Sequence, residues 1–132
     1  MLETKLMELS DARSVVEAAK REAAANGWKI SVSVVDAGGH PILFERTDGA
    51  SPATARIAFE KARTAAIFRG ATGAMEDRIP DRLAMLALPG ATPLKGGVPL
   101  VSGGQVVGAV GISGLLPQQD HQVAEAGAAA LK

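Results

Sequence analysis

The sequence contains no cysteine and no tyrosine, and it has only two histidines in 132 residues. The absence of cysteine excludes disulfide bonds, a catalytic thiolate and cysteine-ligated zinc or iron–sulfur sites. Two histidines are few for a catalytic zinc site, which usually takes three side-chain ligands from the protein. Large apolar residues are also scarce, because alanine and glycine carry much of the apolar content. We therefore expect the chain to bury further surface in a homo-oligomer.

Charge shows no excess of either sign, since 14 basic residues balance 14 acidic ones. No basic run stands out, so nucleic acid is not expected as a partner. No apolar run reaches the roughly 18–20 residues that a membrane span needs, and no membrane partner is expected. The first residues mix charges and lack the apolar centre of a secretion signal. These observations predict a cytoplasmic protein, and the length favours one domain over residues 1–132.

Two hairpins are predicted. Residues 29–46 form two alternating apolar runs around a turn that contains His40, and residues 98–112 form two runs around Gly103-Gly104. A Gly-Gly pair suits a tight hairpin turn because both residues adopt positive φ at little cost. A further short strand is expected near residues 92–95.

Helical periodicity marks three long segments and one interrupted segment. The long segments cover residues 10–25, 52–69 and 118–131, and Ser10 is expected to cap the first of them. Residues 74–88 contain Pro80, so two short helical pieces are expected there. Successive hairpins with intervening helices predict an α+β fold in which helices pack on an antiparallel sheet.

The second helix carries the first candidate binding residues. Lys61 and Thr64 lie three residues apart beside Phe68, and a basic group and a hydroxyl next to an apolar face suit a carboxylate-bearing ligand. A lysine that only extends its amine to solvent is an equally good interpretation. Arg46, at the end of a strand, could hold an anion or pair with Asp48.

The start of the last helix carries the second group of candidates. Asp120 and His121 could supply acid–base chemistry, with Lys61 as a third catalytic group. Asp120 could instead only interact with the dipole at the helix N-terminus. His40 and His121 are the candidate metal ligands, provided that the fold brings them together, although a turn histidine is usually only exposed.

Five motifs followed by a Gln-Asp pair, in this order, resemble the GlcG/HbpS family, which includes the C-terminal domain of PduO-type proteins. The motifs are residues 34–43 (VVDAGGHPIL), 46–50 (RTDGA), 58–65 (AFEKARTA), 96–100 (GGVPL) and 108–114 (GAVGISG), followed by residues 119–120. The resemblance implies a profilin-like α/β/α sandwich with a five-stranded antiparallel sheet, and a homo-oligomer. Some family members bind haem, for which this chain offers only His40, His121 or a methionine as iron ligand.

We therefore expect a small-molecule-binding domain whose ligand is haem or another carboxylated compound. Its site is predicted between the second helix, a loop formed by Gly96, Gly97 and Pro99, and the start of the last helix, either within one chain or at a subunit interface. One alternative is a small lyase, isomerase or hydrolase that acts on a carboxylated or hydroxylated metabolite by acid–base chemistry. Another is an accessory subunit without a ligand, in which that pocket is filled.

Overall fold

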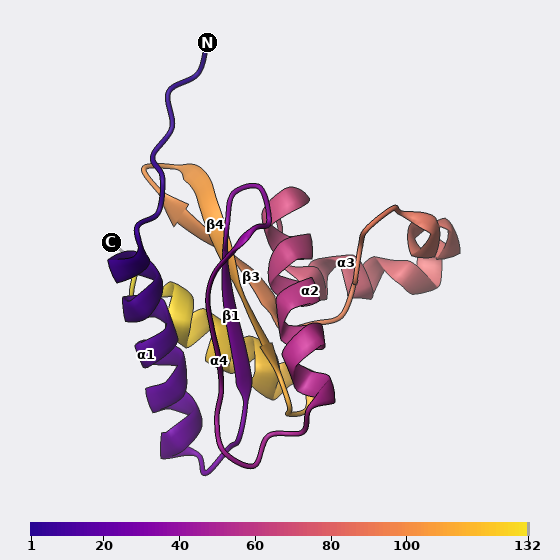
Figure 1. Ribbon diagram of the computed structural model, residues 1–132. Helices are drawn as coiled ribbons and strands as arrows, with labels where there is room; N and C mark the ends of the chain where they lie inside the picture. The colour runs from indigo at the N-terminus through magenta and orange to yellow at the C-terminus, as the bar shows by residue number, and fades with distance from the viewer. Residues whose placement is uncertain (132) are drawn as a thin grey trace.

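The computed structural model describes residues 1–131, and its centre is one antiparallel sheet with the strand order β2-β1-β4-β3 (Figure 1). The two hairpins predicted from the sequence supply all four strands, and their inner strands pair with each other. The strands are β1 (Ser31–Asp36), β2 (Pro41–Arg46), β3 (Gly97–Ser102) and β4 (Gln105–Ser113).

Helices cover both faces of this sheet. Two of them, α1 (Leu9–Ala25) and α4 (Pro117–Ala128), pack on one face and on each other, whereas α2 (Ala53–Ile67) packs on the opposite face. A segment of α3 (Thr72–Arg78) and two short 3-10 turns (Ile79–Asp81 and Leu83–Ala87) projects from the side of the sheet (Figure 1). The predicted α+β class and the α/β/α layering are therefore confirmed.

The sheet packs tightly against α2 because small residues line the contact. The buried face of α2 is built mainly from alanine, including Ala58 and Ala62. A Cβ added at Gly111 of β4 would collide with the carbonyl oxygen of Ala58 and would lie 2.5 Å from the amide nitrogen of Ala62. Glycine at this position lets the helix backbone lie directly against the strand.

The expected fifth strand is absent from residues 1–131, where the sheet has four strands. The short strand predicted near residues 92–95 is wrong, because Pro93 has no N–H to donate and the N–H of Leu94 bonds back to the carbonyl of Thr92. Pairing with β4 begins only at Gly96, whose carbonyl accepts from the N–H of Ile112 at 3.0 Å. The predicted Ser10 cap is also wrong, since the N-cap residue is Glu8, two residues before Ser10, and α1 begins at Leu9.

Strand register defines two ends of the molecule. At one end, which we call the turn end, Asp36 pairs with Gly108 and both hairpins make their turns. At the other, which we call the loop end, Ser31 pairs with Ser113 and the connections to the helices begin. None of the helices in residues 1–131 combines the length and the apolar character that crossing a bilayer requires.

Candidate functional site

The structure joins Lys61 of α2 and Asp120 of α4 in a buried ion pair. The Nζ atom of Lys61 lies 3.0 Å from Oδ2 of Asp120 and donates a second hydrogen bond, also of 3.0 Å, to the carbonyl of Ile112. The other carboxylate oxygen of Asp120 accepts from the N–H of Leu115 at 3.1 Å. Only 5% and 4% of the two side chains is exposed. The pair therefore connects the helical layers on the two faces of the sheet.

The glycines that precede β3 make room for this pair. A Cβ at Gly96 would lie 2.9 Å from Nζ of Lys61 and 3.0 Å from Cβ of Asp120, and the φ of Gly96 is +130°. At Gly97 a Cβ would collide with the carbonyl oxygen of Lys61. The structure thus brings together Lys61, Gly96, Gly97 and Asp120, as the sequence predicted for one site.

The space between these residues is filled by their own contacts. None of the five hollows described on residues 1–131 is lined by Lys61, by the two glycines or by Asp120. Burial raises the pKa of the Asp120 carboxyl, and this effect outweighs the lowering by the charge and hydrogen bond of Lys61 and by the Leu115 N–H. None of these five hollows supplies the binding cavity expected at this position, and the predicted site stays a prediction. The catalytic roles of Lys61 and Asp120 stay predictions.

Other predicted ligand-binding residues serve the fold or lie at the surface. The buried hydroxyl of Thr64 donates to the carbonyl of Glu60 at 2.8 Å and accepts from the N–H of Thr92 at 2.9 Å. Phe68 ends α2 and is 38% exposed. Pro99 lies within β3, half-buried, and Arg46 is exposed at the end of β2. Their roles toward a ligand stay predictions.

Thr72 is a structural residue that sequence reasoning missed. It is fully buried, and its hydroxyl accepts from the N–H of Gly97 at 2.8 Å. This bond satisfies the N–H of Gly97 at the start of β3, a strand whose outer edge no other strand covers in residues 1–131. The sequence carried no clear signal for it, because Thr72 lies in a glycine-rich break that is typical of an exposed loop.

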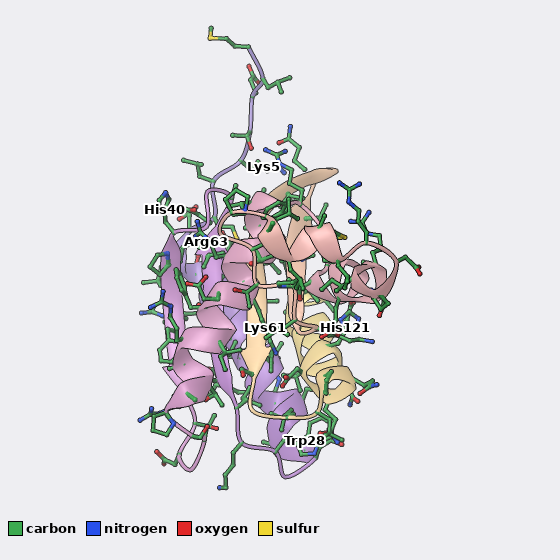
Figure 2. All side chains as sticks on the ribbon, turned by 90° about the vertical axis from the view of Figure 1, so that its right-hand side faces the viewer. Lys5, Trp28, His40, Lys61, Arg63 and His121 are labelled. Carbon is green, nitrogen blue, oxygen red and sulfur yellow. The ribbon has the colours of Figure 1, made fainter. Side chains whose placement is uncertain are left out.

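The two histidines lie in different parts of the molecule (Figure 2). His40 is exposed in the β1–β2 turn at the turn end, whereas His121 follows β4 in the first turn of α4, at the loop end. They do not form a shared metal site within the chain. Residues 1–131 also contain no cluster of three or more His, Asp or Glu side chains that could hold a metal ion.

His121 is largely engaged with its own helix. Its Nε2 atom lies 3.3 Å from Oε1 of Glu125, and 31% of its side chain is exposed. Its Nδ1 atom is buried without a hydrogen-bond partner. Neither ring nitrogen is therefore freely presented to a ligand.

His40 instead belongs to a turn that packs, through Gly39, against a basic and an apolar side chain of α2, which the sequence did not reveal. A Cβ at Gly39 would lie 3.0 Å from Cγ of Arg63 and 3.2 Å from Cγ2 of Ile67, so the turn packs against these side chains of α2. Arg63 donates to the carbonyl of Gly90 at 2.8 Å and lies 4.0 Å from Oε2 of Glu60, and Ile67 is 37% exposed. The i, i+4 spacing of Arg63 and Ile67 on a predicted helix was the available signal.

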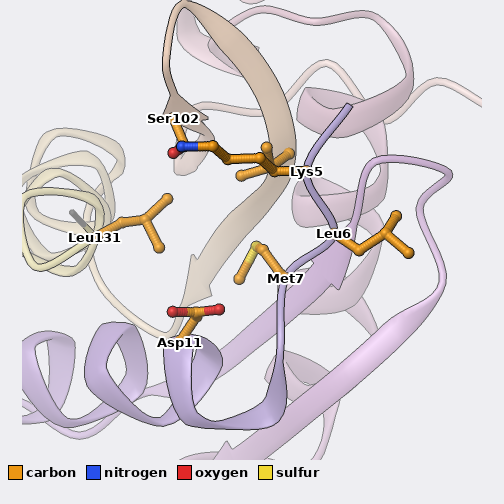
Figure 3. A pocket seen from close by; sticks show the side chains of 7 residues that line it. Lys5, Leu6, Met7, Asp11, Ser102 and Leu131 are labelled. Atoms are coloured by element: carbon orange, nitrogen blue, oxygen red, sulfur yellow. The ribbon is translucent and has the colours of Figure 1, made fainter. Parts of the chain in front are cut away.

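Figure 3 shows another hollow, beside the segment that precedes α1. Lys5, Met7 and Asp11 contribute to its wall, and its volume is about 140 Å³. Pockets for drug-sized ligands are larger, about 300–1,000 Å³. None of the predicted site residues lines this hollow.

Comparison with known proteins finds a matching family model and a similar curated protein. A family model described as "Haem degrading protein HbpS-like" matches residues 7–129. The curated protein GlcG of Escherichia coli K12 is 46% identical over 103 residues, which are 77% of each chain.

Two solved structures are also similar over nearly the whole chain. A double mutant of Streptomyces reticuli HbpS has 32% identity and a TM-score of 0.92, with 100% of this chain and 91% of the other covered. A structure described as a PduOC:heme complex has 27% identity and a TM-score of 0.87, with coverage of 97% and 96%.

Proposed function

The chain belongs to the HbpS-like family, whose model covers nearly all of it, and from this premise we propose that it is a haem-binding domain. The observation that carries the proposal is the similarity to the PduOC:heme complex, which extends over 97% of this chain. The HbpS structure, with a TM-score of 0.92, supports the same class of ligand, because the description of the HbpS-like family model names haem.

The side chains around His40 suit haem. An exposed imidazole is a common iron ligand, and this chain has no cysteine or tyrosine to replace it. His40 would hold the iron, the guanidinium of Arg63 would pair with a carboxylate of the ligand, and Ile67 would contact the apolar ring. When bound, haem would supply an iron centre; the chain supplies the ligand, the charge and the apolar contact.

His40 is a better candidate for the iron ligand than His121 or Met7. Both ring nitrogens of His121 are hindered, one by Glu125 and the other by burial. Met7 lines a hollow of only about 140 Å³, which is too small for a tetrapyrrole. The imidazole of His40 is exposed at the turn end, and none of the five hollows described on residues 1–131 includes it, so haem would bind there on an open surface.

Titration of the protein with haemin, followed by the Soret band, tests the proposal. We expect a saturable shift for the wild-type protein, a loss of that shift for His40→Ala, and an unchanged titration for the matched control His121→Ala. No saturable shift in the wild-type protein would overturn haem binding. Loss of the Soret shift in His121→Ala but not in His40→Ala would overturn the assignment of His40 as the iron ligand.

The acid–base enzyme alternative has less support. Lys61 and Asp120 hydrogen-bond to each other, and none of the hollows described on residues 1–131 gives a substrate access to them. No comparison favours such an activity over ligand binding. A homo-oligomer, a cytoplasmic location and a single-domain organisation remain part of the proposal; light scattering measures the first of them directly.

A further inference from the structure

The loop end of the molecule carries an open cleft around Trp28. Two hollows, of about 360 and 420 Å³, share Trp28 and Lys29 in their walls. The α1–β1 connection and the loop before α2 border both hollows. Gly114, which follows β4, borders the second hollow, so three loop segments contribute to the walls. We call these two neighbouring hollows together the Trp28 cleft, and we propose that it binds a small planar aromatic monocarboxylate beside Trp28 and Lys29.

Trp28 supplies the surface for an aromatic ring. It is the only tryptophan of the chain, and its indole is half-buried against the core while it borders both hollows. A partly anchored indole offers a flat, rigid face on which a planar ring stacks, typically for about 0.5–1.5 kcal/mol beyond the burial of area.

Unpaired positive charge supplies the contact for a carboxylate. The charged residues in the wall are Lys20, Arg21, Lys29 and Asp48. Lys20 is already paired with Glu45 at 2.9 Å and with Glu17 at 3.4 Å. Arg21 and Lys29 form none of the ion pairs found among residues 1–131.

The single acidic wall residue limits the charge of the ligand. Lys29 reaches only a backbone oxygen, that of Asp48, at 3.4 Å. Arg21 and Lys29 carry two unpaired positive charges, and Asp48 carries one negative charge. The excess of one positive charge favours a ligand with one negative charge over a dianion.

The backbone keeps Lys29 at the rim of the cleft. A Cβ at Gly49 would lie 2.7 Å from Cδ of Lys29, and Gly49 has a φ of +88°. Glycine at this position lets the lysine stem lie along the loop with its amine beside the cleft. The hydroxyl of Thr54, deeper in the wall, already contacts Ser31 at 2.8 Å and donates to Ser51 at 2.6 Å, so the charged rim and the indole would recognise the ligand.

The ligand of this cleft is not haem. No histidine, methionine, cysteine or tyrosine lines either hollow, so the wall offers no residue of the usual types for an iron. Figure 2 places Trp28 and His40 toward opposite ends of the molecule. The cleft is therefore a second site, independent of the haem proposal.

Tryptophan emission gives a direct test, because Trp28 is the only tryptophan and tyrosine is absent. The full chain, without haemin, is titrated with benzoate and with the neutral benzamide. We expect a saturable change with benzoate and a much weaker one with benzamide. Lys29→Met should weaken the benzoate affinity about tenfold, the effect of losing roughly 1.4 kcal/mol, whereas the matched control Lys5→Met, at the turn end, should leave it unchanged.

Three results would overturn the proposal. One is quenching that rises linearly without saturation for both compounds, as collisional quenching does. Another is an equal benzoate affinity for wild type and Lys29→Met. The third is a haemin titration that saturating benzoate abolishes, since this would mean one shared site. Unaltered haemin binding in the presence of benzoate supports two separate sites.

Discussion

Two lysines of this chain, Lys61 and Lys29, occupy opposite environments. Lys61 is buried, and the chain itself supplies both of its acceptors, the carboxylate of Asp120 and the carbonyl of Ile112. Lys29 is exposed at the rim of the Trp28 cleft and reaches only a backbone carbonyl, at 3.4 Å. Each lysine packs against a glycine from another segment, Lys61 against Gly96 and Lys29 against Gly49, and sequence pattern alone does not show these contacts.

The difference shows where a ligand can gain binding energy. A buried charge must be compensated inside the protein, because leaving it alone costs several kcal/mol. Its partners are therefore used by the fold and are not free for a ligand. An exposed charge needs no partner for stability. We infer that the Lys61–Asp120 pair mainly stabilises the fold and that the unpaired charges at the surface are better candidates for binding.

The largest expected effect follows from Lys61→Met. This change leaves the carboxylate of Asp120 buried without its partner, and we expect the free energy of unfolding to fall by about 3–5 kcal/mol at neutral pH. Urea unfolding followed by circular dichroism measures it. The double variant Lys61→Met with Asp120→Leu should recover much of the loss, because no buried charge then remains. A loss below about 1 kcal/mol for the single variant would contradict a structural role for the pair.

A smaller effect on the free energy of unfolding is expected from the titration of Asp120 with pH. Burial raises the pKa of Asp120 above its ordinary value of 3.8, so the folded protein holds this proton more tightly than the unfolded chain. The contribution to stability is therefore fully present below about pH 3.8 and is lost as the pH rises through the folded pKa.

Asp120→Asn removes this titration and isolates its effect. The free energy of unfolding of the wild-type protein, minus that of the variant, should decrease as the pH rises above 3.8. Urea unfolding of both proteins at several pH values gives this difference. An increase with pH would show instead that Lys61 lowers the pKa of Asp120 more than burial raises it.

The smallest effect on stability is expected from Lys29→Met. An exposed lysine with only a 3.4 Å contact to a carbonyl should change the free energy of unfolding by less than about 0.5 kcal/mol. The same urea measurement serves for comparison with Lys61→Met. A loss comparable to that of Lys61→Met would remove the contrast between the two lysines.

Much of the fold could be predicted from local patterns. The Gly103-Gly104 turn is formed, with φ values of 57° and 77°, and Pro80 divides the segment after α2 into short helical pieces. The fifth strand could not be judged from the sequence, because whether a short segment joins a sheet depends on which partner edge lies beside it. The family resemblance implied five strands, and a short strand was expected separately near residues 92–95, where the N–H of Leu94 instead bonds to the carbonyl of Thr92.

The candidate site was predicted only in part. Residues of three distant segments, Lys61, Gly96 and Asp120, were expected together and do lie together. The sequence did not reveal that they fill the space between them. It also did not show that the β1–β2 turn packs against Arg63 at Gly39, or that Thr72 accepts from the N–H of Gly97 at the edge of β3.

The amino-acid sequence by itself determined the elements of this protein, since turn chemistry and hydrophobic periodicity act between near neighbours along the chain. It also determined that few residues could ligate iron, because composition alone excludes cysteine and tyrosine. Only the tertiary structure decided which charges are paired, which histidine is accessible and which loops surround Trp28. These properties depend on distances between residues far apart in the chain, and the packing of helices on both faces of the sheet sets those distances.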